Sequence, residues 1–354
     1  MNIPSYITKT AALLALSILA STSVRAGNED RAGQAGAPEL LINPWAASAG
    51  WGMASMAGAT GIDATFLNVA GIARNTSKFE LGFNHTNYWA GIGISAAGFN
   101  ARVSEESVFG ITLMTLNSGD IDRTTVEAPS GNTEGTFSFG NTIIGIQYAK
   151  NFTPAISGGI NMKIVNEGTA DISATGVAID VGVQYFAGDN EKMKFGVALK
   201  NIGAKMSFTG DGDDQSLLSG SGDFNQTYEY RESQFELPVQ MVISGSYDFQ
   251  LDSINKITPA AAFTSNSFIK DRLSIGAEYA YKENLKVHVG YDHEAGVFDD
   301  YENGRTTALT GLSAGFVFSL PVGALKDQQL SVSYAYRSAD PFKSPHAFGL
   351  NLKL

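Results

Sequence analysis

Cysteine is absent from all 354 residues of the chain. The sequence therefore excludes a disulfide framework, a thiolate metal site and a thiol nucleophile. Charged residues are also few, at 17%, and the formal net charge is -11. Because phosphate binding needs a basic face, we expect no nucleic-acid partner.

Long apolar runs are equally scarce. The stretch Ala11 to Ala20 is too short to span a bilayer, and the following Val24-Arg25-Ala26 approximates the A-x-A cleavage rule. We expect residues 1–26 to be a signal peptide that is removed after Ala26. No later segment approaches the roughly 20 apolar residues of a membrane helix, so an integral protein would have to cross as strands.

Alternation with a period of two is abundant instead. In residues 176–185, small or polar side chains alternate with Val177, Ile179, Val181, Val183 and Tyr185, a pattern that no helix shows. Similar runs predict about fourteen strands, an even number that is usual in bacterial outer-membrane barrels. The candidate strands are 79–87, 90–101, 107–117, 142–151, 155–166, 174–187, 193–202, 236–250, 257–264, 271–282, 285–293, 308–320, 329–338 and 345–354.

The predicted fold class is all-β, a transmembrane antiparallel β-barrel with an N-terminal plug-like segment. Residues 27–76 form the N-terminal tail and plug-like segment, and residues 77–354 form the barrel. Short connections, such as 151–154 and 282–284, alternate with long ones, such as 119–140 and 206–235. Outer-membrane barrels place long loops outside and short turns in the periplasm. We therefore expect a protein of the Gram-negative outer membrane, surrounded by lipid.

The plug-like segment differs from the barrel in composition. It is rich in Ala, Gly and Met, and Pro44, Gly50 and Gly58 prevent an uninterrupted spanning helix. Irregular backbone at membrane depth needs protein around it, so we expect the segment to pack into or against the barrel wall, either as a stabilising plug or as a movable gate. The residues expected to make this contact are Trp45, Trp51, Met53, Met56, Phe66 and Asn68.

The alternation also predicts which side chains face the lumen. On the lipid face, a charge near the midplane would cost about 2–4 kcal/mol. We therefore expect Val181→Arg to block assembly, and Asp180→Asn or Asn161→Arg to be mild. The lumen-facing polar residues either brace and hydrate the lumen or line a transport path; they include Lys163, Asp180, Glu278, His288 and Asp292.

Closure of the barrel is predicted at the C-terminus. The last residues again alternate, and an unpaired strand edge would leave backbone groups that lipid cannot satisfy. We expect this strand to pair with the first barrel strand, near residues 79–83. The apolar residues of the closing strand are Phe348, Leu350, Leu352 and Leu354.

Signals for enzymatic chemistry are weak. Residues 91–96 fit G-x-G-x-x-A, but they lie within a strand rather than between a strand and a helix. Residues 210–214 could hold Ca²⁺, although they lack the spacing of an EF-hand and are better explained as a solvated acidic loop. We expect no catalytic residue, no metal site and no cofactor.

Three segments of the plug carry a family resemblance. Residues 37–42 (APELLI), 46–54 (AASAGWGMA) and 68–73 (NVAGIA) resemble the opening of the PorV/PorQ family, which is related to the FadL fatty-acid transporters. That opening runs F-L-x-I, A-R-A-x-G-M-G, N-P-A-G-L-A. This sequence departs from it at Ala54, where the family has Gly, and at Val69, where the family has Pro.

The resemblance implies an outer-membrane protein of Bacteroidota-type bacteria that works with the type IX secretion system. Relatives of this kind receive the C-terminal signal domain of exported cargo and pass the cargo on for surface attachment. The expected partners are secretion-system proteins or cargo signal domains. A FadL-like conduit for hydrophobic small molecules and a structural barrel subunit are the alternatives.

Overall fold

The computed structural model of the chain describes residues 27–126, 128–131, 135–169, 171–220, 222, 224–228, 232–297, 306–322 and 328–354. The predicted signal peptide, residues 1–26, lies outside these ranges, so its cleavage stays a prediction. No helix in the described ranges is long and apolar enough to cross a membrane.

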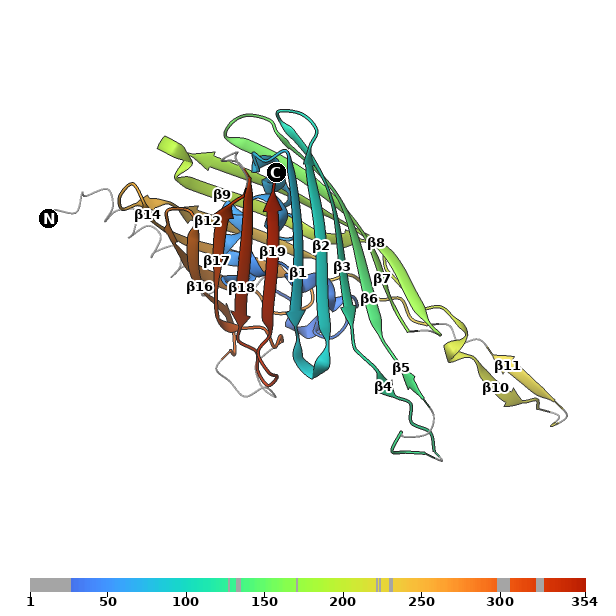
Figure 1. The fold of residues 1–354 in the computed structure, drawn as a ribbon. Helices are drawn as coiled ribbons and strands as arrows, with labels where there is room; N and C mark the ends of the chain where they lie inside the picture. Colours follow the sequence, from blue (N-terminus) through green and yellow to red (C-terminus); the bar gives the residue numbers. More distant parts are fainter. Residues whose placement is uncertain are drawn as a thin grey trace.

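The strands close into an antiparallel barrel (Figure 1). The main sheet has fifteen strands; β13 (Phe249–Gln250) only extends the pairing along β14, and the other fourteen form a ring because β12 pairs with both β9 and β14. Closure gives every strand two neighbours, as a lipid environment requires. The barrel strands are β1 (Phe79–Asn87), β2 (Gly93–Arg102), β3 (Ser107–Asn117), β6 (Gly140–Asn151), β7 (Ile156–Gly168), β8 (Ser173–Ala187), β9 (Met193–Gly203), β12 (Gln240–Tyr247), β14 (Asn255–Asn266), β15 (Arg272–Tyr281), β16 (Leu285–Glu294), β17 (Gly311–Pro321), β18 (Gln329–Arg337) and β19 (His346–Lys353).

The predicted fold class is confirmed, and β1 and β3 have the predicted bounds. Strand β12 begins at Gln240 rather than at residue 236. Pro238 has no N–H for a ladder, and Asn201 donates a hydrogen bond to the Pro238 carbonyl (3.0 Å). Strand β17 likewise begins at Gly311 rather than at residue 308.

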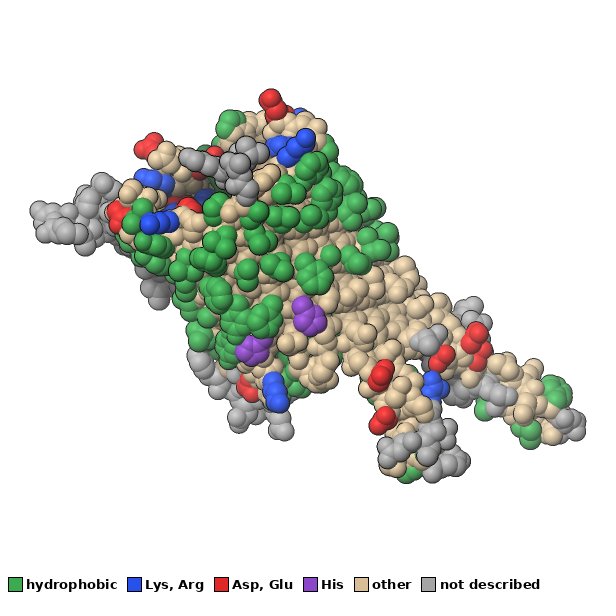
Figure 2. Space-filling model, viewed as in Figure 1, with side chains coloured by type: hydrophobic (Ala, Val, Ile, Leu, Met, Phe, Trp, Pro, Cys, Tyr) green, Lys and Arg blue, Asp and Glu red, His purple; other side chains and the backbone are tan. Residues whose placement is uncertain are grey.

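The two faces of the wall differ as the alternation predicts. In β8, the side chains of Val177, Val181 and Val183 point outward and are 39–50% exposed, while Asp180 and Gln184 between them are buried inside. Figure 2 shows outward apolar side chains over much of the barrel wall, with the charged side chains gathered toward its ends. The outer face therefore suits hydrocarbon, whereas polar groups are turned inward.

The two ends of the barrel differ in their connections. At one end, which we call the short-turn end, tight turns follow β2, β6, β8 and β15, and Leu354 pairs with Phe79 through hydrogen bonds of 2.9 and 3.0 Å. The turn between β15 and β16 is short because Lys282 and Glu283 both adopt positive φ angles. The opposite end is the long-loop end. By the rule for outer-membrane barrels, the short-turn end faces the periplasm.

Two hairpins extend past the wall at the long-loop end (Figure 1). The β3–β6 connection carries one two-stranded sheet and the β9–β12 connection carries the other. Their strands are β4 (Ile121–Asp122), β5 (Thr136–Phe137), β10 (Gln215–Leu218) and β11 (Asn225–Tyr228).

The N-terminal segment forms short helices inside the barrel (blue in Figure 1). Frequent glycines, such as Gly52 and Gly61 with positive φ, keep each helix to one or two turns. The helices before β1 are η2 (Glu29–Arg31), η3 (Pro38–Leu41), α2 (Ala46–Ala49), η4 (Gly52–Gly58), η5 (Gly61–Asp63), α3 (Ala64–Leu67) and η6 (Val69–Arg74). Three more lie in connections: η7 (Trp89–Gly91), η8 (Asp189–Glu191) and η9 (Asp211–Asp213).

Candidate functional site

The candidate site is the lumen, which the N-terminal segment crosses from end to end. At the long-loop end, the Gly36 N–H donates to the carbonyl of Glu236 in the β9–β12 connection (3.1 Å). At the short-turn end, the Asn75 side chain donates to Glu80 near the start of β1 (2.7 Å). The segment between these contacts, residues 37–75, is hereafter called the plug.

The plug places all the predicted contact residues inside the barrel. Five of them are at most 9% exposed and Phe66 is half-buried; the five are Trp45, Trp51, Met53, Met56 and Asn68. The Trp45 indole donates to Thr65 within the plug (2.9 Å), and Phe66 lies 3.6 Å beneath the Lys200 ammonium group of β9. Met53 and Met56 share an apolar cluster with barrel residues such as Val242.

Asn68 fixes the plug to the wall. Its carboxamide oxygen accepts from the Ala70 N–H (3.2 Å) and so caps η6. Its amide nitrogen donates to the Val183 carbonyl of β8 (3.0 Å), with a longer contact to the Val197 carbonyl of β9 (3.4 Å). One side chain thus holds both a plug helix and two strands.

Lumen-facing glycines make room for this close contact. A Cβ added at Gly182 of β8 would collide with the Asn68 carboxamide, and one at Gly290 of β16 would lie 2.6 Å from Trp51 Cα. A Cβ added at Gly82 of β1 or at Gly98 of β2 would collide with the Ile62 side chain of the plug. The plug backbone therefore packs against the wall on several sides, which explains part of the high glycine content.

The predicted lumen residues of β7 and β8 form one buried network. The Lys163 ammonium lies 2.7 Å from Asp180, and the Asn161 side chain and the Asn201 N–H donate to the same carboxylate (3.2 and 2.7 Å). Gln147 donates to Asn161 (3.1 Å) and extends the network to β6. These groups are held by one another beneath the plug rather than by an aqueous channel.

The other predicted lumen residues lie on the opposite wall and do not join that network. His288 stacks on Trp51 with ring centroids 5.7 Å apart, and its Nδ1 lies 3.9 Å from Glu278. Asp292 pairs with Arg337 at 3.3 Å. The structure thus divides the five predicted residues among three separate groups: Lys163 with Asp180, Glu278 with His288, and Asp292 with Arg337.

Glu80 is a lumen residue that the sequence analysis missed. Its carboxylate accepts from Asn75 of the plug (2.7 Å), Asn100 of β2 (3.3 Å) and Asn351 of β19 (2.9 Å). The only available signal was its place between two outward-facing residues of β1. Glu80 joins the end of the plug to both the first and the last barrel strand.

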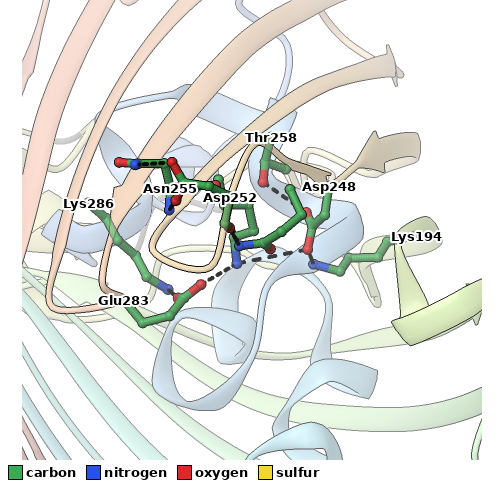
Figure 3. A network of polar contacts seen from close by, with 9 residues as sticks. Lys194, Asp248, Asp252, Asn255, Thr258, Glu283 and Lys286 are labelled. Carbon is green, nitrogen blue, oxygen red and sulfur yellow. Dashed lines mark hydrogen bonds and ion pairs between the residues drawn. The ribbon is translucent and has the colours of Figure 1, made fainter.

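A polar cavity of about 230 Å³ opens at the short-turn end. Figure 3 shows the ion pairs at its edge: Lys194 with Asp248 (2.8 Å), and Glu283 with both Lys256 (2.6 Å) and Lys286 (3.2 Å). Partial burial by itself would raise the pKa of Glu283, but the two ammonium groups hold it at about 2. These charges compensate one another and brace the mouth of the barrel.

A second cavity, of about 490 Å³, lies at the long-loop end above the plug and is called the long-loop cavity. Its lining is mainly apolar and includes Ile42, Trp89 and Leu309. Between the two cavities, the plug residues Trp45 and Ile62 lie against Gly82 and Gly98 in the middle of β1 and β2 and are each 2% exposed. The plug therefore fills the middle of the lumen.

Cysteine pairs would test the seat of the plug. We expect Met56→Cys with Gln184→Cys to react with a short bifunctional cross-linker, because Gln184 donates to the Met56 carbonyl (3.2 Å). Met56→Cys with Val183→Cys should not react, since Val183 faces outward. Mass spectrometry of the cross-linked peptide gives the result. Equal reaction of both pairs would mean that the plug lies elsewhere.

Comparison with protein families gives one match. Residues 70–340, more than half of the chain, match the family described as "Type IX secretion system membrane protein PorP/SprF". None of the curated proteins compared matches the chain.

Solved structures share the fold at low sequence identity. The chain is similar to the "CymD monoaromatic hydrocarbon channel" at 14% identity, covering 88% of this chain and 97% of that one with a TM-score of 0.54. A FadL homologue of Pseudomonas aeruginosa is 10% identical, with 86% of this chain and 97% of that one covered and a TM-score of 0.51. The toluene transporter TodX of Pseudomonas putida is 13% identical, with 86% of this chain and 97% of that one covered and a TM-score of 0.50. At these identities the likeness shows a FadL-like fold and carries no information on ligands.

Proposed function

Because the chain belongs to the PorP/SprF family of type IX secretion system membrane proteins, we propose that it serves this system through protein–protein contacts at its long-loop end. The barrel is an outer-membrane protein, and neither the family nor the fold is enzymatic. The filled lumen supports a contact role rather than passage of a solute through the barrel.

The family match agrees only in part with the resemblance seen in the sequence. The plug motifs resemble PorV/PorQ, whereas the matching family is PorP/SprF. Both point to type IX secretion and to a FadL-like barrel. We include in the proposal the narrower role known for PorV/PorQ proteins, which is to receive cargo signal domains and to deliver cargo to the surface.

The β10–β11 hairpin is the observation that carries the proposal. It projects from the barrel and carries exposed apolar side chains (Figure 2). Leu217, Leu218, Phe224 and Tyr228, which lie along the hairpin from its base to its turn, are 47–66% exposed. An isolated two-stranded sheet is at best marginally stable in water, and exposed apolar patches mark interaction sites. A protein partner that covers these side chains would stabilise the hairpin.

Substitution of this surface would test the proposal. We expect Leu218→Ser with Phe224→Ser to leave barrel levels unchanged but to reduce surface delivery of type IX cargo and co-purification of secretion proteins. Val103→Ser is the matched control, because Val103 is exposed in a turn at the opposite end. Normal cargo delivery in cells that lack the whole protein would reject the proposal.

A FadL-like conduit is the second candidate, supported by the apolar lining of the long-loop cavity. Passage would require the plug to move, and a ligand moves it only by binding the moved state more tightly. Uptake of a radiolabelled monoaromatic hydrocarbon should then depend on the protein and change on deletion of residues 37–72. Equal uptake with and without the protein would reject the conduit.

A further inference from the structure

Two buried carboxyl groups meet at the floor of the long-loop cavity. Glu39 belongs to η3 of the plug and Glu167 to β7, and they are 2% and 4% exposed. The two carboxyl groups lie within hydrogen-bonding reach of each other, with the Asn141 carboxamide beside them. Asn141 of β6 is the cross-strand partner of Glu167 and is 5% exposed.

The Asn141 carboxamide and a backbone N–H come close to Glu39, but the oxygens of this cluster lack donors in regular hydrogen-bond geometry. Among the described residues, neither oxygen of Glu39 has a hydrogen-bond partner, and the same holds for Oε1 of Glu167 and Oδ1 of Asn141. Two ionised carboxylates have no hydrogen to share, and burying a charge without a partner costs several kcal/mol.

Two species could relieve this cluster: a proton or a metal cation. A proton shared by the carboxyl groups satisfies one oxygen of each and leaves the Asn141 oxygen without a partner. A cation can be coordinated by both carboxylates and by the carboxamide oxygen at the same time. All three residues line the long-loop cavity, whose volume leaves room for water ligands.

We propose that Glu39, Glu167 and Asn141 bind a hard divalent cation of the Ca²⁺ class, which ties the start of the plug to β6 and β7. Ca²⁺ takes six to eight oxygen ligands in flexible geometry, including bidentate carboxylates, carboxamide oxygens and water. The three residues are far apart in the sequence, so no loop motif announces the site. The exposed Asp211 and Asp214, the sequence candidate for Ca²⁺, serve as the control.

The test uses the full mature barrel, extracted in detergent, stripped with a chelator and titrated with Ca²⁺ by calorimetry and thermal unfolding. We expect one binding event and an unfolding temperature that rises with Ca²⁺ concentration, as ligand linkage requires. Glu39→Gln with Glu167→Gln should weaken binding at least about tenfold, because fewer charged ligands remain. This variant removes the repulsion between the carboxylates, so it should fold, and an unboiled gel band checks that it does.

Asp211→Asn with Asp214→Asn should bind Ca²⁺ as the unchanged protein does. If the unchanged protein shows no heat of binding and no Ca²⁺-dependent shift, the carboxyl groups share a proton and the proposal is wrong. Binding that is lost only in the Asp211→Asn, Asp214→Asn variant would also overturn it. Cargo delivery is a separate readout, so failure here leaves the proposed function unaffected.

Discussion

Removal of residues 346–354 is expected to abolish accumulation of the barrel in the outer membrane. Strand β19 pairs with β1 on one side and with β18 on the other. Its loss would leave two open strand edges in hydrocarbon, where each unsatisfied backbone group costs several kcal/mol. It would also remove Asn351, one of the donors to Glu80.

Immunoblots of outer-membrane fractions, with and without boiling of the sample, measure this effect. The control is deletion of residues 215–228, the β10–β11 hairpin, which lies outside the barrel ring. That variant should accumulate and keep a heat-modifiable band. A normal level of the β19 deletion would contradict closure between β19 and β1.

Asp180→Asn is expected to lower the free energy of unfolding by about 3–5 kcal/mol, the usual cost of breaking a buried ion pair on one side. The substitution leaves the Lys163 ammonium buried and weakens the acceptor for Asn161 and Asn201. The mild effect expected from the sequence assumed a hydrated lumen, whereas the plug covers this part of the wall. Asn161→Arg should be severe for the same reason, since Asn161 is buried between two partners.

Urea unfolding in micelles, followed by tryptophan fluorescence, measures the loss. Lys163→Met combined with Asp180→Asn should recover part of the lost free energy of unfolding, because no unpaired charge then remains. Lys150→Met is the matched control: Lys150 pairs with Glu106 at 3.2 Å, but both side chains are exposed, so the change should cost at most about 1 kcal/mol. Similar losses for Asp180→Asn and Lys150→Met would show that the network is solvated.

The sequence predicted most of the fold because strand alternation is a local property. It gave the outward face of Val181, the inward face of Asp180 and the bounds of β1 and β3. It placed the start of β12 too early, although Pro238 argued against a ladder there. It also missed Glu80, since one acidic residue between apolar neighbours shows its direction but not its partners.

What the sequence by itself determined is the class of barrel, the face of each strand and the presence of an irregular segment that needs protein around it. Only the tertiary structure decided that this segment crosses the whole lumen, that Lys163 and Asp180 meet beneath it, and that Glu39 meets Glu167. The reason is physical: a period of two fixes the direction of a side chain within its own strand. Which groups then meet depends on strand register and on the path of the plug, and both are set by contacts between residues far apart in the chain.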